Sequence, residues 1–397
     1  MKKIVVLYPY ETGQNAFSGG VPKVIVSNII AINNNGDKPF LVLPNDNLGL
    51  ITFVKNEYSF CEIIPVNFKS LALYSDSNGL SKYVLIFKHL KGFIFGKRAL
   101  KTAISKISPD IIHFHEVINF PLLNIYPKAK IVLHLHSYRF TGYGKMLNYI
   151  LYIINKRANI IISPTNSILN ALGEDLRVHS RVVNTPYMEL KVNDVKAKNS
   201  EIVKEFKGYQ NSGKIIFSFV GRICAIKRVD HFITALSKLN SNQRSKIIFS
   251  IVGGTNTEGD KDYKEKLLKL IATHKLESVV KFHGYINPIE QILPLINYGV
   301  ILSESEAVPM IGIEYMRFDI PIFGYKAPGI SDFLVNNKNG FLIDNGSIES
   351  LTELLKDVLT CKTDNINFNE SIPVIFKRHT IDEFTIVLDE VYKGLLV

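Results

Sequence analysis

Apolar runs of strand length alternate with longer amphipathic segments along this chain. The runs at 3–8 and 215–220 are apolar at nearly every position, as central strands of a parallel sheet require. The segments 230–239 and 263–274 instead have apolar residues three and four positions apart, which indicates helices. This alternation predicts parallel βα units. The other strands that we expect are 39–43, 111–115, 130–135, 159–163, 246–252, 279–282, 299–302 and 321–324.

A polar stretch at 191–213 divides these units into two sets. It has little periodicity, although 202–206 can form a short helix. Because 397 residues exceed what one hydrophobic core usually serves, we expect two domains, the first at 1–195. The sequence therefore predicts an α/β protein with two doubly wound, Rossmann-like domains. Such domains bind ligands beyond the carboxyl ends of their strands.

The composition is that of a folded chain, with 46% apolar and 21% charged residues. The first apolar run, 4–8, is too short for a signal peptide, and no later run is long enough to span a bilayer. The three cysteines match neither a disulfide framework nor a metal site and fit a reducing compartment. They are Cys61, Cys224 and Cys361. We therefore expect a cytoplasmic protein.

The net charge of +11 points to an anionic partner, which can be nucleic acid, lipid or a phosphorylated substrate. No helix-turn-helix, zinc-finger or RNP pattern occurs, so we expect no nucleic acid. The stretch 88–106 interleaves basic with apolar residues and is either a membrane-surface helix or an ordinary amphipathic helix. At most, the protein is peripheral at the inner face of the plasma membrane.

Two carboxylates follow a strand of the second half. Glu306 comes just after the strand 299–302, and Glu314 lies eight positions later, close to two helical turns, so both can face one side. Carboxylates accept paired hydroxyl protons of sugar and ribose rings, and the amides of a helix start attract a diphosphate. The alternative is a helix cap and an exposed Glu. Neither a GxGxxG loop after the first strand nor a Walker A sequence occurs.

Two cations follow the first strand of the second half. Arg222 comes directly after Gly221, and Lys227 follows five positions later. Arg offers a planar fork for phosphate oxygens and Lys a mobile point charge, so the two can stabilise a departing nucleoside diphosphate. A solvated loop with ordinary surface charges is the alternative. Their combination with the two carboxylates favours a site.

These residues resemble the family-4 retaining glycosyltransferases of the GT-B fold, in which two Rossmann-like domains face across a cleft. The likeness rests on Gly221-Arg222 with Lys227 and on the spacing from Glu306 to Glu314. Ser18-Gly19-Gly20-Val21 is similar to the family's glycine loop, and 132–136 to its strand that ends in a histidine. The segment 376–392 resembles the closing helix. The resemblance implies a donor domain at 196–378 and a helix at 379–397 that returns to the first domain.

The resemblance also implies a role for each matching residue. Arg222 and Lys227 would bind the diphosphate, Glu306 the sugar hydroxyls and Glu314 the ribose. His136 would lie beside the transferred sugar, and Tyr285 near the nucleobase. The implied catalytic residues are His136, Glu306, Arg222 and Lys227. The implied donor-binding residues are Gly19, Gly20, Arg222, Lys227, Tyr285, Glu306, Pro309, Met310, Ile311 and Glu314.

Two further patterns invite a metal. Asp260-Lys261-Asp262 imitates a metal-binding acidic pair, but we interpret it as a helix start, where acidic residues are favoured. His113 and His115 share a strand face, and with His134 we interpret them as packed or hydrogen-bonded histidines. We expect no metal and no other cofactor. Glu116, just past the strand 111–115, can meet an acceptor hydroxyl.

The function that the resemblance implies is sugar transfer with retention of anomeric configuration. The donor would be a UDP- or GDP-sugar, and the acceptor a glycan or a polyprenyl-linked glycan of bacterial cell-surface polysaccharide or lipopolysaccharide synthesis. A nucleotide-sugar epimerase of related fold and a non-catalytic sugar-nucleotide-binding module are the alternatives. Turnover of a donor excludes the module, and product analysis without acceptor separates the epimerase.

Overall fold

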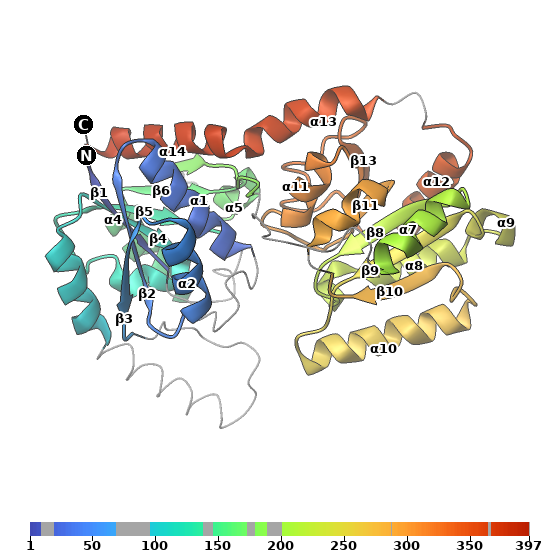
Figure 1. The fold of residues 1–397 in the computed structure, drawn as a ribbon, viewed down its shortest axis with the longest axis horizontal. Coiled ribbons are helices and arrows are strands. Elements are labelled where there is room, and N and C mark those ends of the chain that lie inside the picture. Colours follow the sequence, from blue (N-terminus) through green and yellow to red (C-terminus); the bar gives the residue numbers. More distant parts are fainter. Residues whose placement is uncertain are drawn as a thin grey trace. The chain divides into compact units, whose positions relative to one another are not determined.

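The structure is a computed structural model that describes residues 1–8, 20–68, 96–137, 146–172, 179–188, 201–286, 288–363 and 367–396. The chain forms two compact units (Figure 1). The first unit consists of Met1–Met188 and His379–Val397, and the second of Glu189–Arg378. Gly19 lies outside the described residues, and so does 88–95 of the basic stretch.

The first unit is built on a sheet of seven parallel strands in the order β3-β2-β1-β4-β5-β6-β7. Its central strands are buried on both faces, which explains their continuous apolar sequence. The strands are β1 (Lys3–Leu7), β2 (Lys38–Pro44), β3 (Glu62–Val66), β4 (Ile111–His115), β5 (Lys130–His134), β6 (Ile160–Ser163) and β7 (Ser180–Val182).

Helices cover this sheet, and the last of them comes from the end of the chain. Helix α14 (Ile381–Leu396) packs along α1 (Val21–Asn34), as Figure 1 shows. The Asn35 side chain donates a hydrogen bond to the Thr385 carbonyl at 3.2 Å. The other helices of this unit are α2 (Leu48–Glu57), the helix at 96–107, η1 (Val117–Leu122), α4 (Met146–Arg157) and α5 (Asn166–Asn170).

The second unit has a sheet of six parallel strands in the order β10-β9-β8-β11-β12-β13. The chain builds one half of the sheet outward from β8 and then returns to build the other half from β11. The ring of Phe217, in β8, packs against the rings of Phe232 and Phe323, and Phe232 packs in turn against Phe249. The strands are β8 (Ile215–Val220), β9 (Ile247–Val252), β10 (Val280–Gly284), β11 (Tyr298–Ile301), β12 (Ile322–Tyr325) and β13 (Gly340–Ile343).

Helices of the second unit connect these strands. Helix α8 packs on α10 and α12, and α11 packs on α13. The longer helices are α7 (Glu201–Asn211), α8 (Val229–Ser237), α10 (Glu258–Thr273), α11 (Met310–Arg317), α12 (Ile348–Leu359) and α13 (Phe368–Phe376). The shorter ones are η4 (Ala225–Lys227), α9 (Ser241–Arg244), η5 (Ile289–Gln291), η6 (Leu293–Leu295) and η7 (Lys377–His379).

All ten expected strands are present, and so are both expected helices. Two helices extend beyond their predicted bounds. The helix expected at 263–274 begins at Glu258, and the short helix expected at 202–206 is the eleven-residue α7. The strands β3, β7 and β13 were not predicted. No helix in the described ranges is both long enough and apolar enough to cross a membrane.

Candidate functional site

Each sheet reverses its strand order beside its first strand, at β1 and β4 in the first unit and at β8 and β11 in the second. In open parallel sheets, ligands bind beyond the carboxyl ends of the strands at such a switch point. The Arg222–Lys227 loop follows β8, and the Glu306 loop follows β11. Because Tyr298 of β11 lies opposite Phe217 of β8, the two loops begin side by side.

The structure joins Lys227 to Glu306. The Lys227 Nζ pairs with Glu306 Oε1, and the Ser303 Oγ donates a hydrogen bond to the same oxygen at 2.6 Å. The side chains of Lys227 and Glu306 are 25% and 14% exposed, so the pair is partly shielded from water yet open to a ligand. An ammonium and a carboxylate therefore meet at the switch point, where one can bind phosphate and the other hydroxyl groups.

Backbone contacts fix the Glu306 loop on both sides. The amide of Glu304 donates to the Ile226 carbonyl at 2.9 Å, and the amide of Glu306 donates to the Pro328 carbonyl at 3.0 Å. Gly329, with φ of +78°, lies against Glu306, and a Cβ there would be 1.6 Å from the Glu306 carbonyl oxygen. Only a glycine fits this conformation and this contact.

Arg222 pairs with Asp260 rather than with Glu306. Its guanidinium lies 3.7 Å from the carboxylate of Asp260 and is 47% exposed. Asp260 accepts hydrogen bonds from the amides of Asn256 and Thr257, while Thr257 Oγ1 accepts from the Asp260 amide. This reciprocal capping box begins α10, so Asp260 has the helix-start role that the sequence predicted.

Helix α11 starts beside this loop. Pro309 is its N-cap residue, no side chain caps the helix, and Pro309 itself has no N–H. The amides of Met310 and Ile311 have no acceptor within the helix, as in any first turn. Glu314 is buried, with 7% exposure. The next residue, Tyr315, donates from its hydroxyl to the Ser218 carbonyl at 2.7 Å, which ties α11 to β8.

Three further predicted donor-binding residues belong to other elements than this pair. Tyr285 follows β10, which is two strands from β8, and its side chain is 80% exposed. Gly20 is the N-cap residue of α1 in the first unit. Gly19 falls outside the described residues.

His136 lies in the first unit, in a cluster of four buried histidines. It is 8% exposed, follows β5, and its Nε2 lies 2.7 Å from the Nδ1 of His115. Burial disfavours the imidazolium and lowers the pKa of His136 to about 3. The ring is therefore neutral at physiological pH.

The other histidines are hydrogen-bonded, as the sequence predicted. His113 contacts Tyr392 Oη through Nδ1 at 2.7 Å and His134 through Nε2 at 3.2 Å. His115 contacts His136 and the Asn28 side chain. One nitrogen from each of His113, His115 and His134 lies within 4.8 Å of the others, as in a metal site. Because His113 and His115 use both nitrogens in hydrogen bonds, a metal ion would have to break some of these bonds.

Glu116, at the carboxyl end of β4, has a strained backbone with φ of 70° and ψ of 150°. This region is almost reserved for glycine, and such strain gathers at functional positions. Its carboxylate accepts a hydrogen bond from Ser137 Oγ at 3.3 Å. Glu116 and His136 thus lie near the ends of paired strands of the first unit.

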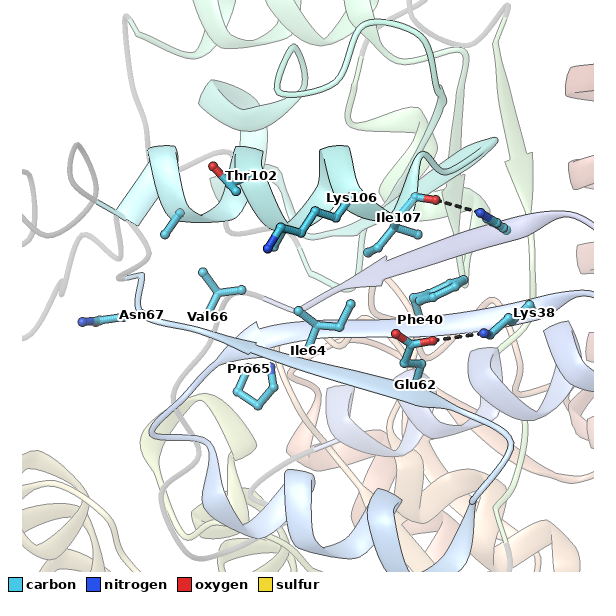
Figure 2. A pocket seen from close by; sticks show the side chains of 13 residues that line it. Lys38, Phe40, Glu62, Ile64, Pro65, Val66, Asn67, Thr102, Lys106 and Ile107 are labelled. Atoms are coloured by element: carbon cyan, nitrogen blue, oxygen red, sulfur yellow. Dashed lines mark hydrogen bonds and ion pairs between the residues drawn. The ribbon is translucent and has the colours of Figure 1, made fainter.

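A hollow of about 730 Å³ opens between β2, β3 and the helix at 96–107 (Figure 2). Lys3, Lys38 and Glu62 line it, and each is the first residue of its strand. The hollow holds none of the predicted site residues. It is therefore not the candidate site.

Comparison with known proteins decides the family. Residues 201–372, which make up most of the second unit, match the family model for glycosyl transferases group 1. The second unit is a group 1 glycosyltransferase domain. This glycosyltransferase superposes over its full length on Anabaena HepE, solved with UDP, with a TM-score of 0.73 and 17% identity; the match covers 100% of both chains. Its two doubly wound units are those of the GT-B fold.

Two curated relatives extend the comparison. The glycosyltransferase is 22% identical to the N-acetyl-alpha-D-glucosaminyl L-malate synthase of Bacillus anthracis over 260 residues, which are 62% of this chain and 66% of that relative. The match thus spans just under two thirds of that relative's length. It is 21% identical over 309 residues to the capsular polysaccharide biosynthesis glycosyltransferase CapM of Staphylococcus aureus, with 75% of each chain covered.

Sequence reasoning missed three residues of these sites. Gly329 contacts Glu306 and Asn28 contacts His115 through tertiary structure, and Ser303 contacts Glu306 from three residues earlier in the same loop. Asn28 did leave a signal, since it is a polar residue within the apolar run of α1. Ser303 and Gly329 do not interrupt an apolar pattern in this way, so the sequence does not single them out.

Proposed function

We propose that this glycosyltransferase moves a sugar from a nucleoside-diphosphate sugar to a glycan or lipid-linked acceptor with retention of anomeric configuration. The observation that carries the proposal is the Lys227–Glu306 pair at the switch point of the second sheet. UDP bound to HepE, a protein of the same fold, supports a UDP-sugar, and a GDP-sugar is the other donor to test.

Lys227 and the start of α11 supply the positive charge that stabilises a departing diphosphate. As the bond from the sugar to the diphosphate breaks, negative charge grows on the phosphate oxygen. The ammonium of Lys227, the guanidinium of Arg222 from the same loop and the amides of Met310 and Ile311 stabilise that charge. The same groups leave no need for a metal ion, so transfer should continue unchanged in EDTA.

Glu306 orients the sugar. Its carboxylate accepts hydroxyl protons of the hexose, and Ser303 holds it in place. Glu314 binds the ribose, and Tyr285 lies near the nucleobase. The acceptor hydroxyl attacks on the face from which the diphosphate leaves, through an oxocarbenium-like state, and a phosphate oxygen takes its proton. His136 contacts the transferred sugar.

The relatives suggest the acceptor class. CapM is named for capsular polysaccharide biosynthesis, and the Bacillus anthracis relative for an alpha-linked glucosaminyl product. A cell-surface glycan, free or lipid-linked, fits both the first name and the net charge of +11. An acceptor of this kind places the enzyme at the cytoplasmic face of the membrane, as a peripheral protein.

Lys227→Ala tests the proposal. We expect turnover of the preferred UDP- or GDP-sugar to fall by about a hundredfold or more, because a charged group that acts in the transition state is lost. Lys238→Ala is the matched control, since Lys238 forms a surface ion pair with Glu349 at 2.5 Å in the same unit. Parental turnover in Lys227→Ala would contradict the assignment, and a product formed without acceptor that is an epimer of the donor would indicate an epimerase.

A further inference from the structure

A line of hydrogen bonds connects helix α1 to His136 within the first unit. The Asn28 Nδ2 lies 3.4 Å from His115 Nε2, and His115 Nδ1 lies 2.7 Å from His136 Nε2. The His115 and His136 rings are within 2° of parallel, with centres 5.0 Å apart. This distance between ring centres is the one expected for two imidazoles that lie in one plane and are joined by a nitrogen-to-nitrogen hydrogen bond. The hydrogen bond between His115 and His136 therefore lies in the plane of both rings, where it is strongest.

The direction of this line follows from Asn28. Its Nδ2 also donates to the Val24 carbonyl at 3.1 Å. An amide oxygen in that place would face another oxygen, so the atom that contacts His115 is the nitrogen, which only donates. His115 Nε2 must therefore accept.

A neutral imidazole has one N–H, so the remaining protons are fixed in turn. Because His115 Nε2 accepts, its proton lies on Nδ1 and is donated to His136 Nε2. His136 then has its own proton on Nδ1. Burial and the neighbouring histidines hold the pKa of His115 well below its ordinary value, so the neutral form applies.

His136 Nδ1 is the nitrogen open to a ligand. Among the described residues His136 has a single hydrogen-bond partner, His115. That bond uses Nε2, so Nδ1 has no hydrogen-bond partner within the described ranges and is left for a ligand. A neutral N–H donor there can bind a sugar oxygen without adding a positive charge beside an oxocarbenium-like state.

We propose that Asn28 and His115 are positioning residues that hold His136 in the Nδ1–H tautomer, so that it donates a hydrogen bond to the sugar. The proposal rests on the proposed function for its substrate, but the tautomer itself is independent of activity. His113 hydrogen-bonds Tyr392 and His134, and these three residues are not part of the Asn28–His115–His136 line.

The tautomer can be measured directly. In protein labelled with ¹⁵N-histidine, the ring nitrogen shifts at neutral pH distinguish Nδ1–H from Nε2–H, and His136→Gln and His115→Gln assign the signals. We expect the Nδ1–H form for both residues. An Nε2–H form of either one overturns the proposal, whether or not any donor is turned over.

Asn28→Leu then tests the effect on catalysis. We expect His136 to lose its single tautomer and kcat to fall about tenfold, while the donor KM changes less than twofold. Asn35→Ala is the matched control, because the Asn35 side chain, at the end of the same helix, donates to the Thr385 carbonyl and bonds no histidine among the described residues. An unchanged kcat in Asn28→Leu overturns the positioning role. If Asn28→Leu does not fold, the tautomers of the parent protein still decide.

If the parent protein turns over no nucleotide sugar, the proposed function fails, while the tautomer assignment still rests on the measured spectrum.

Tyr392→Phe tests whether the His113–Tyr392 contact is independent of the Asn28–His115–His136 line. It removes the hydroxyl that contacts His113, and we expect the His136 signals to stay in the Nδ1–H form. A change of the His136 tautomer in this variant would contradict the separation of the two lines.

Discussion

Gly329 positions Glu306 by close contact between backbones. Its φ of +78° and the 1.6 Å that would separate a Cβ from the Glu306 carbonyl leave no room for a side chain. Gly329→Ala must therefore move the Glu306 loop, and we expect turnover to fall more than tenfold with a lower unfolding midpoint. Gly208→Ala is the control, since nothing lies within 4 Å of a Cβ in the middle of α7. There alanine should keep activity and raise stability slightly.

At this scale the sequence identifies the residues that follow strands and misses those that support them. Lys227 and Glu306 were predicted because each follows an apolar strand, and the structure joins them. Arg222 was predicted with them, yet its partner is Asp260. A pairing between loops depends on which strands are neighbours, and a single sequence does not state that order.

Among the elements, α10 begins at a capping box whose strength can be measured. Thr257 Oγ1 accepts the amide hydrogen of Asp260, and Asp260 in turn accepts the Thr257 amide. Thr257→Ala should lower the free energy of unfolding of the second unit by about 1 kcal/mol, seen in urea titrations followed by circular dichroism. Thr273→Ala, at the exposed end of the same helix, should have a smaller effect. Equal losses in both variants would mean that the capping box adds no stability.

The elements that the sequence missed share a physical cause. β7 has three residues and β13 four, while β3 contains a proline and an exposed glutamate. All three are edge strands. β3 and β7 are less buried than the central strands, and β13 is short and begins with a glycine, so the apolar signal of each is weak. The central strands are apolar on both faces and were predicted within two residues at each end.

At the scale of the whole molecule, the buried histidines make stability depend on pH. The pKa values of His113 and His136 fall to about 3 from an ordinary 6.5 because burial disfavours their cations, and those of His115 and His134 are also far below it. Between about pH 3 and pH 6.5 the unfolded chain therefore binds more protons than the folded chain. Stability is therefore complete above about pH 6.5 and falls as the pH drops toward 3, because unfolding then lets the buried histidines take up protons.

Urea midpoints at pH 7.5 and 5.5, followed by circular dichroism, measure this slope. We expect a lower midpoint at pH 5.5 and a weaker dependence in His134→Gln, which removes one buried imidazole. His179→Gln serves as the control because His179 is exposed in the same unit. Midpoints that agree at the two pH values would show that the cluster takes up no protons on unfolding.

Since α14 packs in the first unit but follows the second in the sequence, the second unit is in effect an insertion within the first. The polypeptide crosses between them twice. A fragment that stops at residue 188 would lose the buried side chains of Phe384, Leu388 and Tyr392, and with Tyr392 the hydroxyl next to His113. Anyone wishing to isolate the halves can excise the second as one continuous piece. The first must be produced by splicing 379–396 onto 1–188 through a short peptide.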